Sequence, residues 1–186
     1  MVSQRGATSE AWILKREREF LAAHEKYADQ IFRHCLVRIR DREVAKDLAQ
    51  ETFSRAWLYL SKGKEVEYMR AFLYRVANNL IVDYSRKKKT SSLDSMMEED
   101  GFEAEDESAA NPEDIPASRE AVKLLESLDD IYRVVITMRF LDEMSPKEIA
   151  AALDTSENVV SVRIHRGMQR LREMAARTPE CIDNIP

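Results

Sequence analysis

Residues 145–172, SPKEIAAALDTSENVVSVRIHRGMQRLR, decide how the C-terminal part of this chain folds. The SPKE segment at 145–148 matches a capping box with proline at the first helical position, which predicts a helix start. The DTS segment at 154–156 favours a turn and a new N-cap, so a second helix should follow directly. The stretch therefore predicts two helices joined by a tight turn, a shape typical of DNA-reading units.

The second of these helices has two chemically different sides. The apolar residues that recur every three or four positions are Val160, Ile164, Met168 and Leu171. Their spacing predicts a side that faces a core, while Arg163, Arg166 and Arg170 lie on another side. Guanidinium groups spaced in this way can contact phosphates or guanine edges when a helix lies in a DNA groove. A solvated basic face on an ordinary hairpin is the alternative, and this hairpin alone favours DNA binding only moderately.

Composition favours helices throughout the chain. The 186 residues include only four glycines, and no long alternation of Val, Ile and Thr occurs. Ala, Leu, Glu, Lys, Arg and Met are plentiful, so we expect an all-α fold. A chain of this length can form one domain or two small ones, each with a modest core.

Charge divides the chain into parts. The formal net charge is -5, but residues 90–118 hold ten Asp and Glu and no Lys or Arg, which leaves 24 acidic against 29 basic residues elsewhere. This acidic, Ser-rich stretch has little apolar periodicity and predicts a flexible linker. We therefore expect two small helical domains, a bundle over 20–89 and a four-helix module over 119–177, flanked by an extension over 1–19 and a tail over 178–186.

The two cysteines, Cys35 and Cys181, lie far apart, and no signal-like or membrane-length apolar run occurs. These features predict a protein of the reducing cytoplasm without direct membrane insertion. The adjacent pair His34 and Cys35 does not indicate a metal site. Neighbouring side chains on a helix point in different directions, and no second pair of ligands with metal-site spacing occurs in the sequence. We find no catalytic constellation and no cofactor motif, so we expect neither an enzyme nor a bound cofactor.

Two helices of the N-terminal domain carry polar faces of interest. In the helix after residue 41, the polar positions that cluster opposite the apolar stripe are Asp47, Gln50, Glu51 and Ser54. On periodicity alone, an ordinary solvated face is the preferred interpretation of this cluster. The helix over 71–89 ends in four cations, 86–89, which either complement the helix dipole or anchor phosphates. Its Arg75, Asn78 and Asn79 are suited to base edges.

The segment at 61–70 breaks the helical pattern and is typical of a loop. It carries Tyr68 and is followed by Phe72 and Tyr74, with lysines and arginines interleaved. Aromatic rings and cations in this mixture can stack and neutralise unpaired DNA. The aromatic residues are equally compatible with a core, and for Phe72 a core position is at least as good an interpretation.

Three motif blocks in this order resemble a bacterial sigma factor of the sigma-70 family, in its small two-domain, extracytoplasmic-function (ECF) group. The blocks are DREVAKDLAQETFSRAW (41–57), AFLYRVANNLIVDYSRKKK (71–89) and the segment 128–173 that contains the helical hairpin. The resemblance covers about residues 20–175, and three ordered blocks across an acidic linker are far more specific than a lone helix-turn-helix.

The resemblance implies a protein that binds core RNA polymerase, directs it to promoters and assists melting. The implied docking surface for the polymerase, mainly its β′ clamp, is Asp47, Gln50, Glu51, Ser54 and Trp57. The implied minus-ten reader, with a base-flipping loop at 61–70, is Arg70, Arg75, Asn78, Asn79, Asp83, Arg86 and Lys87. The implied minus-thirty-five reader is Ser156, Arg163, His165, Arg166 and Arg170. Promoter DNA, double-stranded and melted, and an anti-sigma factor are the other implied partners.

The chain departs from the family pattern at several positions. Glutamate and aspartate stand at 143 and 154, where the family often has glycine, and Ser161-Val162 stands where a Lys-Ser pair is common. Because Glu143 adopts the left-handed conformation less readily than glycine, we expect a differently shaped turn before Ser145. Gly167 costs about 1 kcal/mol of helix propensity relative to alanine, and the sequence offers no reason for it.

Two other classes of function compete with a sigma factor. A sigma-like decoy could titrate an anti-sigma factor, but the retained cations at 86–89 disfavour it because a decoy needs no DNA contacts. A conventional helix-turn-helix transcription regulator would not need the docking-like block at 41–57.

We also expect the acidic linker to thread polymerase channels that otherwise hold nucleic acid.

Overall fold

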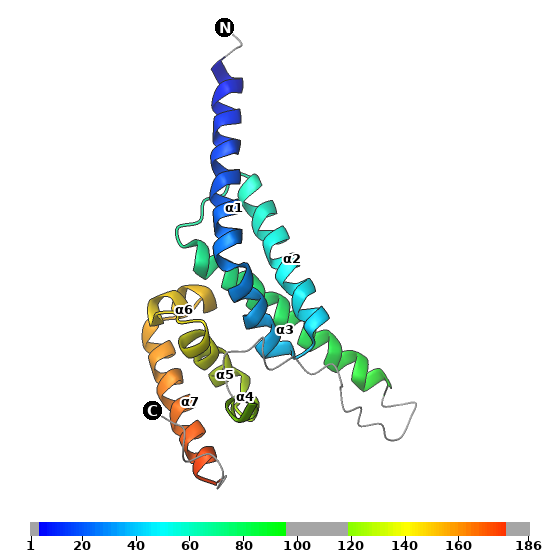
Figure 1. The fold of residues 1–186 in the computed structure, drawn as a ribbon, viewed down its shortest axis with the longest axis vertical. Coiled ribbons are helices and arrows are strands. Elements are labelled where there is room, and N and C mark those ends of the chain that lie inside the picture. The colour runs from blue at the N-terminus through cyan, green and yellow to red at the C-terminus, as the bar shows by residue number, and fades with distance from the viewer. Residues whose placement is uncertain (1–3, 96–118, 178–186) are drawn as a thin grey trace.

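Helices make up nearly all of the chain that the computed structural model describes, which is residues 4–95 and 119–177 (Figure 1). Their bounds are α1 Gln4–Ile39, α2 Arg42–Ser61, α3 Met69–Ser95, α4 Arg119–Glu126, α5 Asp130–Ile136, the π-helical turn η2 Thr137–Leu141, α6 Pro146–Leu153 and α7 Glu157–Arg177. The predicted all-α class is confirmed. We call α1–α3 the N-terminal module and α4–α7 with η2 the C-terminal module. Most of the predicted linker, and the predicted tail, lie outside the described residues.

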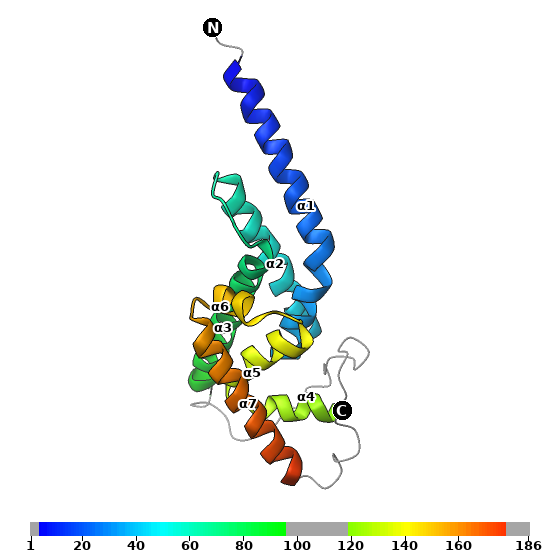
Figure 2. The ribbon, with the colours of Figure 1, turned by 90° about the vertical axis from the view of Figure 1, so that its left-hand side faces the viewer.

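Helix α1 is longer than the sequence pattern predicted. The sequence placed a boundary between an extension over 1–19 and a bundle over 20–89, whereas α1 is continuous over 36 residues across that boundary. It contains no proline, and its only glycine lies in the first turn, so nothing interrupts the backbone pattern. The helix ends at Ile39, and the next residue, Arg40, takes a φ of 65°. The N-terminal half of α1 projects beyond the other helices (Figures 1 and 2).

Helices α2 and α3 complete the N-terminal module. The Asp41 carboxylate caps α2 by accepting a hydrogen bond from the Val44 amide at 3.0 Å. After α2 the chain turns at Gly63, whose φ of 80° favours glycine. Helix α3 begins near the predicted position but continues to Ser95, beyond the predicted end at Lys89.

The hairpin of the C-terminal module forms as predicted. The Glu148 amide donates to Ser145 Oγ at 3.3 Å, and Glu148 Oε2 accepts from the Ser145 amide at 2.8 Å. Both bonds of the capping box are therefore present at the start of α6. Asp154 ends α6 in the left-handed conformation with a φ of 52°. Ser156 then caps α7, because its hydroxyl accepts from the Val159 amide at 3.3 Å.

The turn before α6 corrects one expectation. Glu143 has a φ of 53°, so it takes the left-handed conformation in spite of its Cβ. The expected change in the shape of this turn is therefore wrong, and the chain accepts local strain of roughly 1–2 kcal/mol instead. Before this turn, α5 also passes directly into the wider π-helical turn η2.

Gly167 gains a structural explanation from the packing of α7 on α5. A Cβ placed on this glycine would lie 3.1 Å from Ile136 Cγ1 and 3.2 Å from Tyr132 Cβ. Those distances are shorter than ordinary van der Waals contacts. The absence of a side chain at position 167 therefore lets the two helices approach closely.

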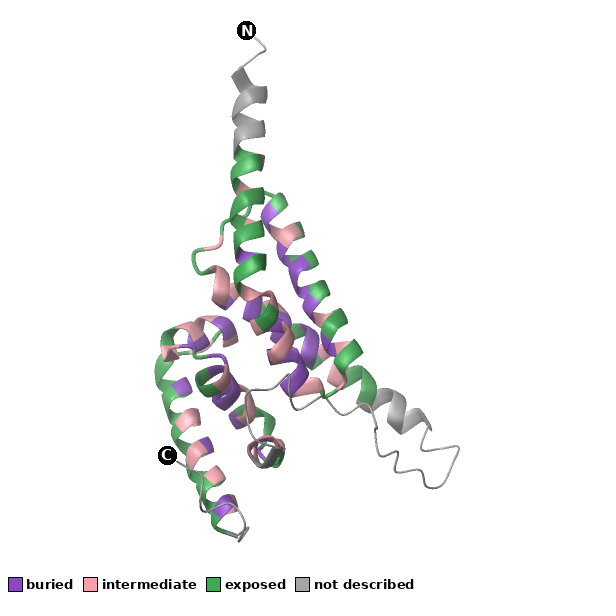
Figure 3. Cartoon of the chain, in the orientation of Figure 1, coloured by how far each residue is buried: buried purple, intermediate pink, exposed green. Residues whose placement is uncertain are grey.

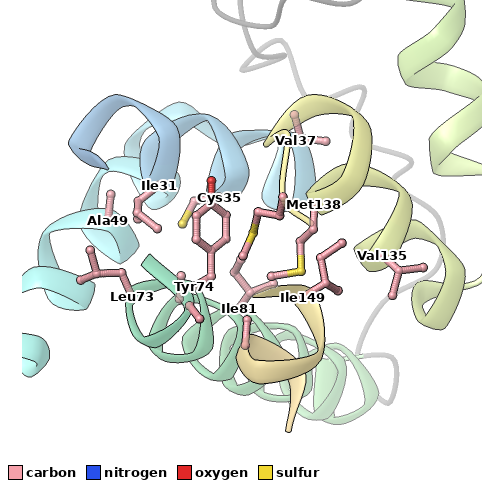
Figure 4. Close-up of a cluster of buried hydrophobic side chains, with 14 of the residues drawn as sticks. Ile31, Cys35, Val37, Ala49, Leu73, Tyr74, Ile81, Val135, Met138 and Ile149 are labelled. Carbon is pink, nitrogen blue, oxygen red and sulfur yellow. The ribbon is translucent and has the colours of Figure 1, made fainter. Parts of the chain in front are cut away.

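The two modules share one hydrophobic core. Buried residues of α1 and α3, such as Cys35, Tyr74 and Ile81, cluster with Met138 and Ile149 of the C-terminal module (Figure 4). Figure 3 shows the buried residues concentrated where the helices of the two modules meet. The sequence predicted two separate domains and contained no signal for this contact.

Candidate docking and nucleic-acid interfaces

The polar face of α2 is exposed along its length. Asp47, Gln50, Glu51 and Ser54 are all exposed, and Arg55 Nε forms a 2.7 Å ion pair with Glu51 Oε1 at the edge of this face. Trp57 differs from these four residues because it is partly buried, with its ring 5.1 Å from that of Phe20. Trp57 therefore supports the face from beneath. No described helix covers the face.

Leu58 belongs to this face, and the sequence interpretation missed it. It follows Glu51 by seven positions and Ser54 by four, which places it on the same side of α2. Its side chain is 57% exposed. An exposed leucine beside a polar cluster is suited to a protein interface. The sequence does contain a signal for it, because Leu58 is apolar but does not lie on the side of α2 that carries the buried residues.

The predicted minus-ten residues divide into two groups in space. Asp83, Arg86 and Lys87 lie toward the C-terminal end of α3, where Arg86 Nη2 donates to Asp83 Oδ1 at 2.7 Å and Lys87 is exposed. Asn79 is also exposed and lines a hollow of about 400 Å³ between α3 and the C-terminal module. These four side chains reach the surface.

Arg70, Arg75 and Asn78 are instead engaged within the chain. Arg75 Nη2 donates to the Ala151 carbonyl at 2.6 Å, and Arg70 Nη2 donates to the Asp142 carbonyl. Asn78 is only 8% exposed. Its amide nitrogen donates to the Tyr74 carbonyl at 2.9 Å. In this conformation Asn78 is not available to a base and Arg70 is largely covered, whereas Arg75 keeps 45% of its side chain exposed.

A second hollow, of about 240 Å³, lies beside the α2–α3 loop. Aromatic rings, one cation and two carboxylates border it, from residues Tyr59, Tyr68, Phe72, Arg75, Glu65 and Glu67. The rings of Tyr59 and Phe72 are 4.9 Å apart, and Lys64 Nζ lies 4.7 Å from the Tyr59 ring centroid. Phe72 thus packs against its own module and also faces the hollow. The aromatic part of the lining can stack a planar base.

Helix α7 presents part of the predicted basic face. His165 and Arg166 are exposed, and Arg163 is partly buried beside the hollow between the modules. Arg170 hydrogen-bonds to Asp129 and lies 4.5 Å from the Tyr132 ring centroid. Arg170 therefore ties α7 to α5. Val162, 41% exposed, lies between these cations and could contact a thymine methyl group.

Cys35 is the one free cysteine among the described residues, and it is fully buried. Burial, with the nearby Asp142 carboxylate, raises the pKa of its thiol to about 12. Within residues 4–95 and 119–177, no group of three His, Cys, Asp or Glu side chains is placed to hold a metal ion. In the same ranges no helix is both long and apolar enough to cross a membrane.

A helix-turn-helix joined to a three-helix module with an exposed polar face is the architecture of a DNA-binding transcription factor. The family model for Sigma-70 region 2 matches residues 23–90, and that for Sigma-70, region 4 matches residues 118–171. The ECF RNA polymerase sigma factor SigW of Bacillus subtilis is 33% identical over 156 residues, which cover 79% of this chain and 83% of SigW. SigM of the same organism is 28% identical, covering 81% and 91% of the two chains. The chain belongs to the ECF sigma factors.

Solved structures share the fold. The sigma factor RpoE, in complex with the anti-sigma factor NepR from Bartonella quintana, superposes with a TM-score of 0.68 at 18% identity, covering 90% of this chain and 99% of RpoE. CnrH, in complex with the cytosolic domain of CnrY, gives a TM-score of 0.64 at 22% identity, covering 87% and 90%. The chain is thus an initiation factor that binds core RNA polymerase and directs it to promoters. Sigma factors are not enzymes, which agrees with the sequence interpretation.

Proposed function

We propose that this sigma factor docks on core RNA polymerase through the α2 face, with the β′ clamp as the main contact. The observation that carries the proposal is the exposure of Asp47, Gln50, Glu51 and Ser54 in one uncovered row, extended by Leu58. A row of carboxylates, amides and one apolar side chain offers both hydrogen bonds and an anchor to a partner. Trp57 holds the row in place through Phe20.

Promoter recognition then falls to α3 and α7. Asn79, Asp83, Arg86 and Lys87 would follow the non-template strand of the minus-ten element, and the aromatic hollow beside the α2–α3 loop would receive one flipped base. Unstacking costs a few kcal/mol, and stacking on aromatic side chains returns roughly 1–3 kcal/mol per base. On α7, Arg163, His165 and Arg166 would read the minus-thirty-five element, with Ser156 at the helix start. Arg170 would contribute to this reading indirectly, by holding α7 against α5.

Control by an anti-sigma factor fits the same architecture. Of the proteins that share this fold, RpoE was solved bound to the anti-sigma factor NepR, and CnrH to the cytosolic domain of CnrY. We place this sigma factor in the cytoplasm, where core polymerase and promoter DNA are found. The exposed cations on α3 and α7 support promoter binding over a decoy, because a decoy would not require them.

Reconstituted transcription tests the docking face. The template is DNA from upstream of the chain's own gene, and the variant is Asp47→Arg, which reverses one charge in the row. Asp29→Arg is the matched control, since it makes the same charge change at an exposed position of α1. We expect defined transcripts with the wild type and the control, and a loss of at least tenfold with Asp47→Arg. Core binding that is unaffected by Asp47→Arg would contradict the proposed face.

A further inference from the structure

The projecting half of α1 passes beside the loop that joins α2 to α3 (Figure 1). Residues 12–19 of this helix lie before the segment that matches Sigma-70 region 2, which begins at residue 23. They nevertheless contact the loop, because Arg16 Nη2 lies 3.7 Å from Glu65 Oε1. A part of the chain that the family model does not match is therefore in contact with the loop beside the aromatic hollow.

Arg16 is held in place by its own helix before it reaches the loop. Its guanidinium carbon lies 5.5 Å from the Trp12 ring centroid, and Nη1 donates to Glu19 Oε2 at 3.4 Å. The Arg16 side chain is only 16% exposed, although it stands on the part of α1 that projects beyond the other helices. A guanidinium that is already ordered by a ring and a carboxylate loses little further freedom when it pairs with Glu65.

The loop separates two hollows. One hollow, of about 640 Å³, lies between α1 and the loop, and the charged residues that line it are Lys15, Arg16, Glu19, Glu65 and Glu67. The other is the aromatic hollow of about 240 Å³. Three consecutive loop residues, 65–67, line both hollows. A shift of these residues toward or away from α1 therefore changes the shape of the aromatic hollow.

The backbone of the loop has little local structure to hold it. Gly63 turns the chain with a φ of 80°, and residues 64–66 belong to no helix or turn. A segment of this kind takes its position from the rigid elements that it contacts. Helix α1 is such an element, because it is continuous through 36 residues.

We propose that the N-terminal half of α1 positions the α2–α3 loop for recognition of the flipped base, with Arg16 as the positioning residue. This inference rests on the proposed role of the aromatic hollow as the site of that base. Arg16 does not touch DNA in this role and acts through Glu65. When the contact is lost, the loop shifts, and the hollow loses its preference among bases while the rest of α3 keeps its own contacts.

Three variants test the contact without altering a proposed DNA-binding residue. Arg16→Glu replaces the attraction to Glu65 by repulsion, because it adds a carboxylate to a hollow that Glu19, Glu65 and Glu67 already line. Arg18→Glu is the matched control, since it makes the same charge change at an exposed position of the same helix. The double variant Arg16→Glu with Glu65→Arg exchanges the two charges and should restore the pair.

Hydrogen exchange of loop residues 62–68 in the free chain measures whether α1 holds the loop. We expect exchange to be about three- to fivefold faster in Arg16→Glu, because an exposed ion pair contributes only modestly to stability. The Arg18→Glu control and the double variant should stay within about twofold of the wild type. Equal exchange in Arg16→Glu and in the control would mean that α1 does not hold the loop, and it would overturn the inference.

Base preference in the polymerase holoenzyme measures whether the position of the loop matters for recognition. The probes are single-stranded oligonucleotides that carry the non-template start region of the chain's own promoter, each with one base changed. We expect Arg16→Glu to lose about threefold or more of the discrimination at one position and to keep the other positions within about twofold. A general defect in folding would instead weaken binding at every position alike. Discrimination that the double variant does not restore would show that Arg16 does not act through Glu65.

Tyr68→Ala separates this inference from the proposed function, because it removes a ring from the aromatic hollow itself. We expect it to abolish discrimination at the same position that Arg16→Glu affects. If Tyr68→Ala has this effect and Arg16→Glu has none, the hollow keeps its proposed role and only the positioning by α1 is overturned. If Tyr68→Ala leaves every position unchanged, the proposed base site is wrong, and the positioning role falls with it.

Discussion

At the scale of single residues, burial makes the Cys35 thiol unreactive. Its thiol is fully buried between the modules, and burial raises its pKa to about 12. Because the thiolate is the reactive form, we expect almost no reaction with a thiol-specific reagent at mildly alkaline pH. The measurement uses a Cys181→Ser chain so that only Cys35 reports. Labelling should be at least a hundredfold slower in the native chain than in denaturant, and equal rates would mean that the core around Cys35 opens freely.

Other residues show where local chemistry misleads. Arg170 has the spacing of a DNA contact on the recognition helix, yet it hydrogen-bonds to Asp129 and stacks on Tyr132. Glu143 lacks the freedom of glycine and still adopts a φ of 53°. For Arg170 the deciding partners, Asp129 and Tyr132, are brought to it by the packing of α7 on α5. A spacing rule records which face of a helix a residue occupies, but not what lies opposite that face.

At the scale of elements, the approach of α7 to α5 depends on Gly167. Leucine at this position would drive its side chain into Ile136 and Tyr132, whose nearest atoms lie 3.1 and 3.2 Å from the point that a Cβ would occupy. We expect Gly167→Leu to lower the free energy of unfolding by about 1–3 kcal/mol, because overpacking forces the helices apart. Ser161→Leu, at an exposed position of the same helix, should change it by less than about 0.5 kcal/mol. Denaturant unfolding of both variants measures the difference, and equal stabilities would contradict the close packing.

The elements themselves could be predicted well from sequence, for identifiable reasons. The capping box at Ser145 and the polar turn at 154–156 are local signals, and both bonds of the box form. Apolar periodicity likewise located α2 and α3. What could not be predicted is that Tyr74 and Ile81 also face the other module. Their spacing is the same whether they pack within one bundle or across two, and the contacts with Met138 and Ile149 join residues far apart in sequence.

At the scale of the whole molecule, charge is sorted across the contact between the two modules. The N-terminal module supplies arginines to the contact, at positions 38, 40, 70 and 75, and the C-terminal module supplies carboxylates and carbonyls. The connecting stretch adds ten further carboxylates over 90–118. The same cations that can bind nucleic acid are thus held against acidic groups of the chain itself. We expect the linker to enter cationic channels of the polymerase, so its charge should matter beyond its length.

The linker's charge is the basis of the last prediction. Replacing its ten Asp and Glu by Asn and Gln removes the negative charge while the size of each side chain is kept. We expect transcription from the chain's own promoter to fall several-fold, because a neutral linker is no longer attracted into channels built to hold nucleic acid. Core binding should persist, since the Asp47 face is unchanged. A linker of the same composition in scrambled order keeps the charge and should support normal transcription, so the order of residues and their charge are tested separately. If the neutral linker initiates as well as the native one, the linker acts only as a tether, and the placement of the two modules on polymerase must come from α2 and α7 alone.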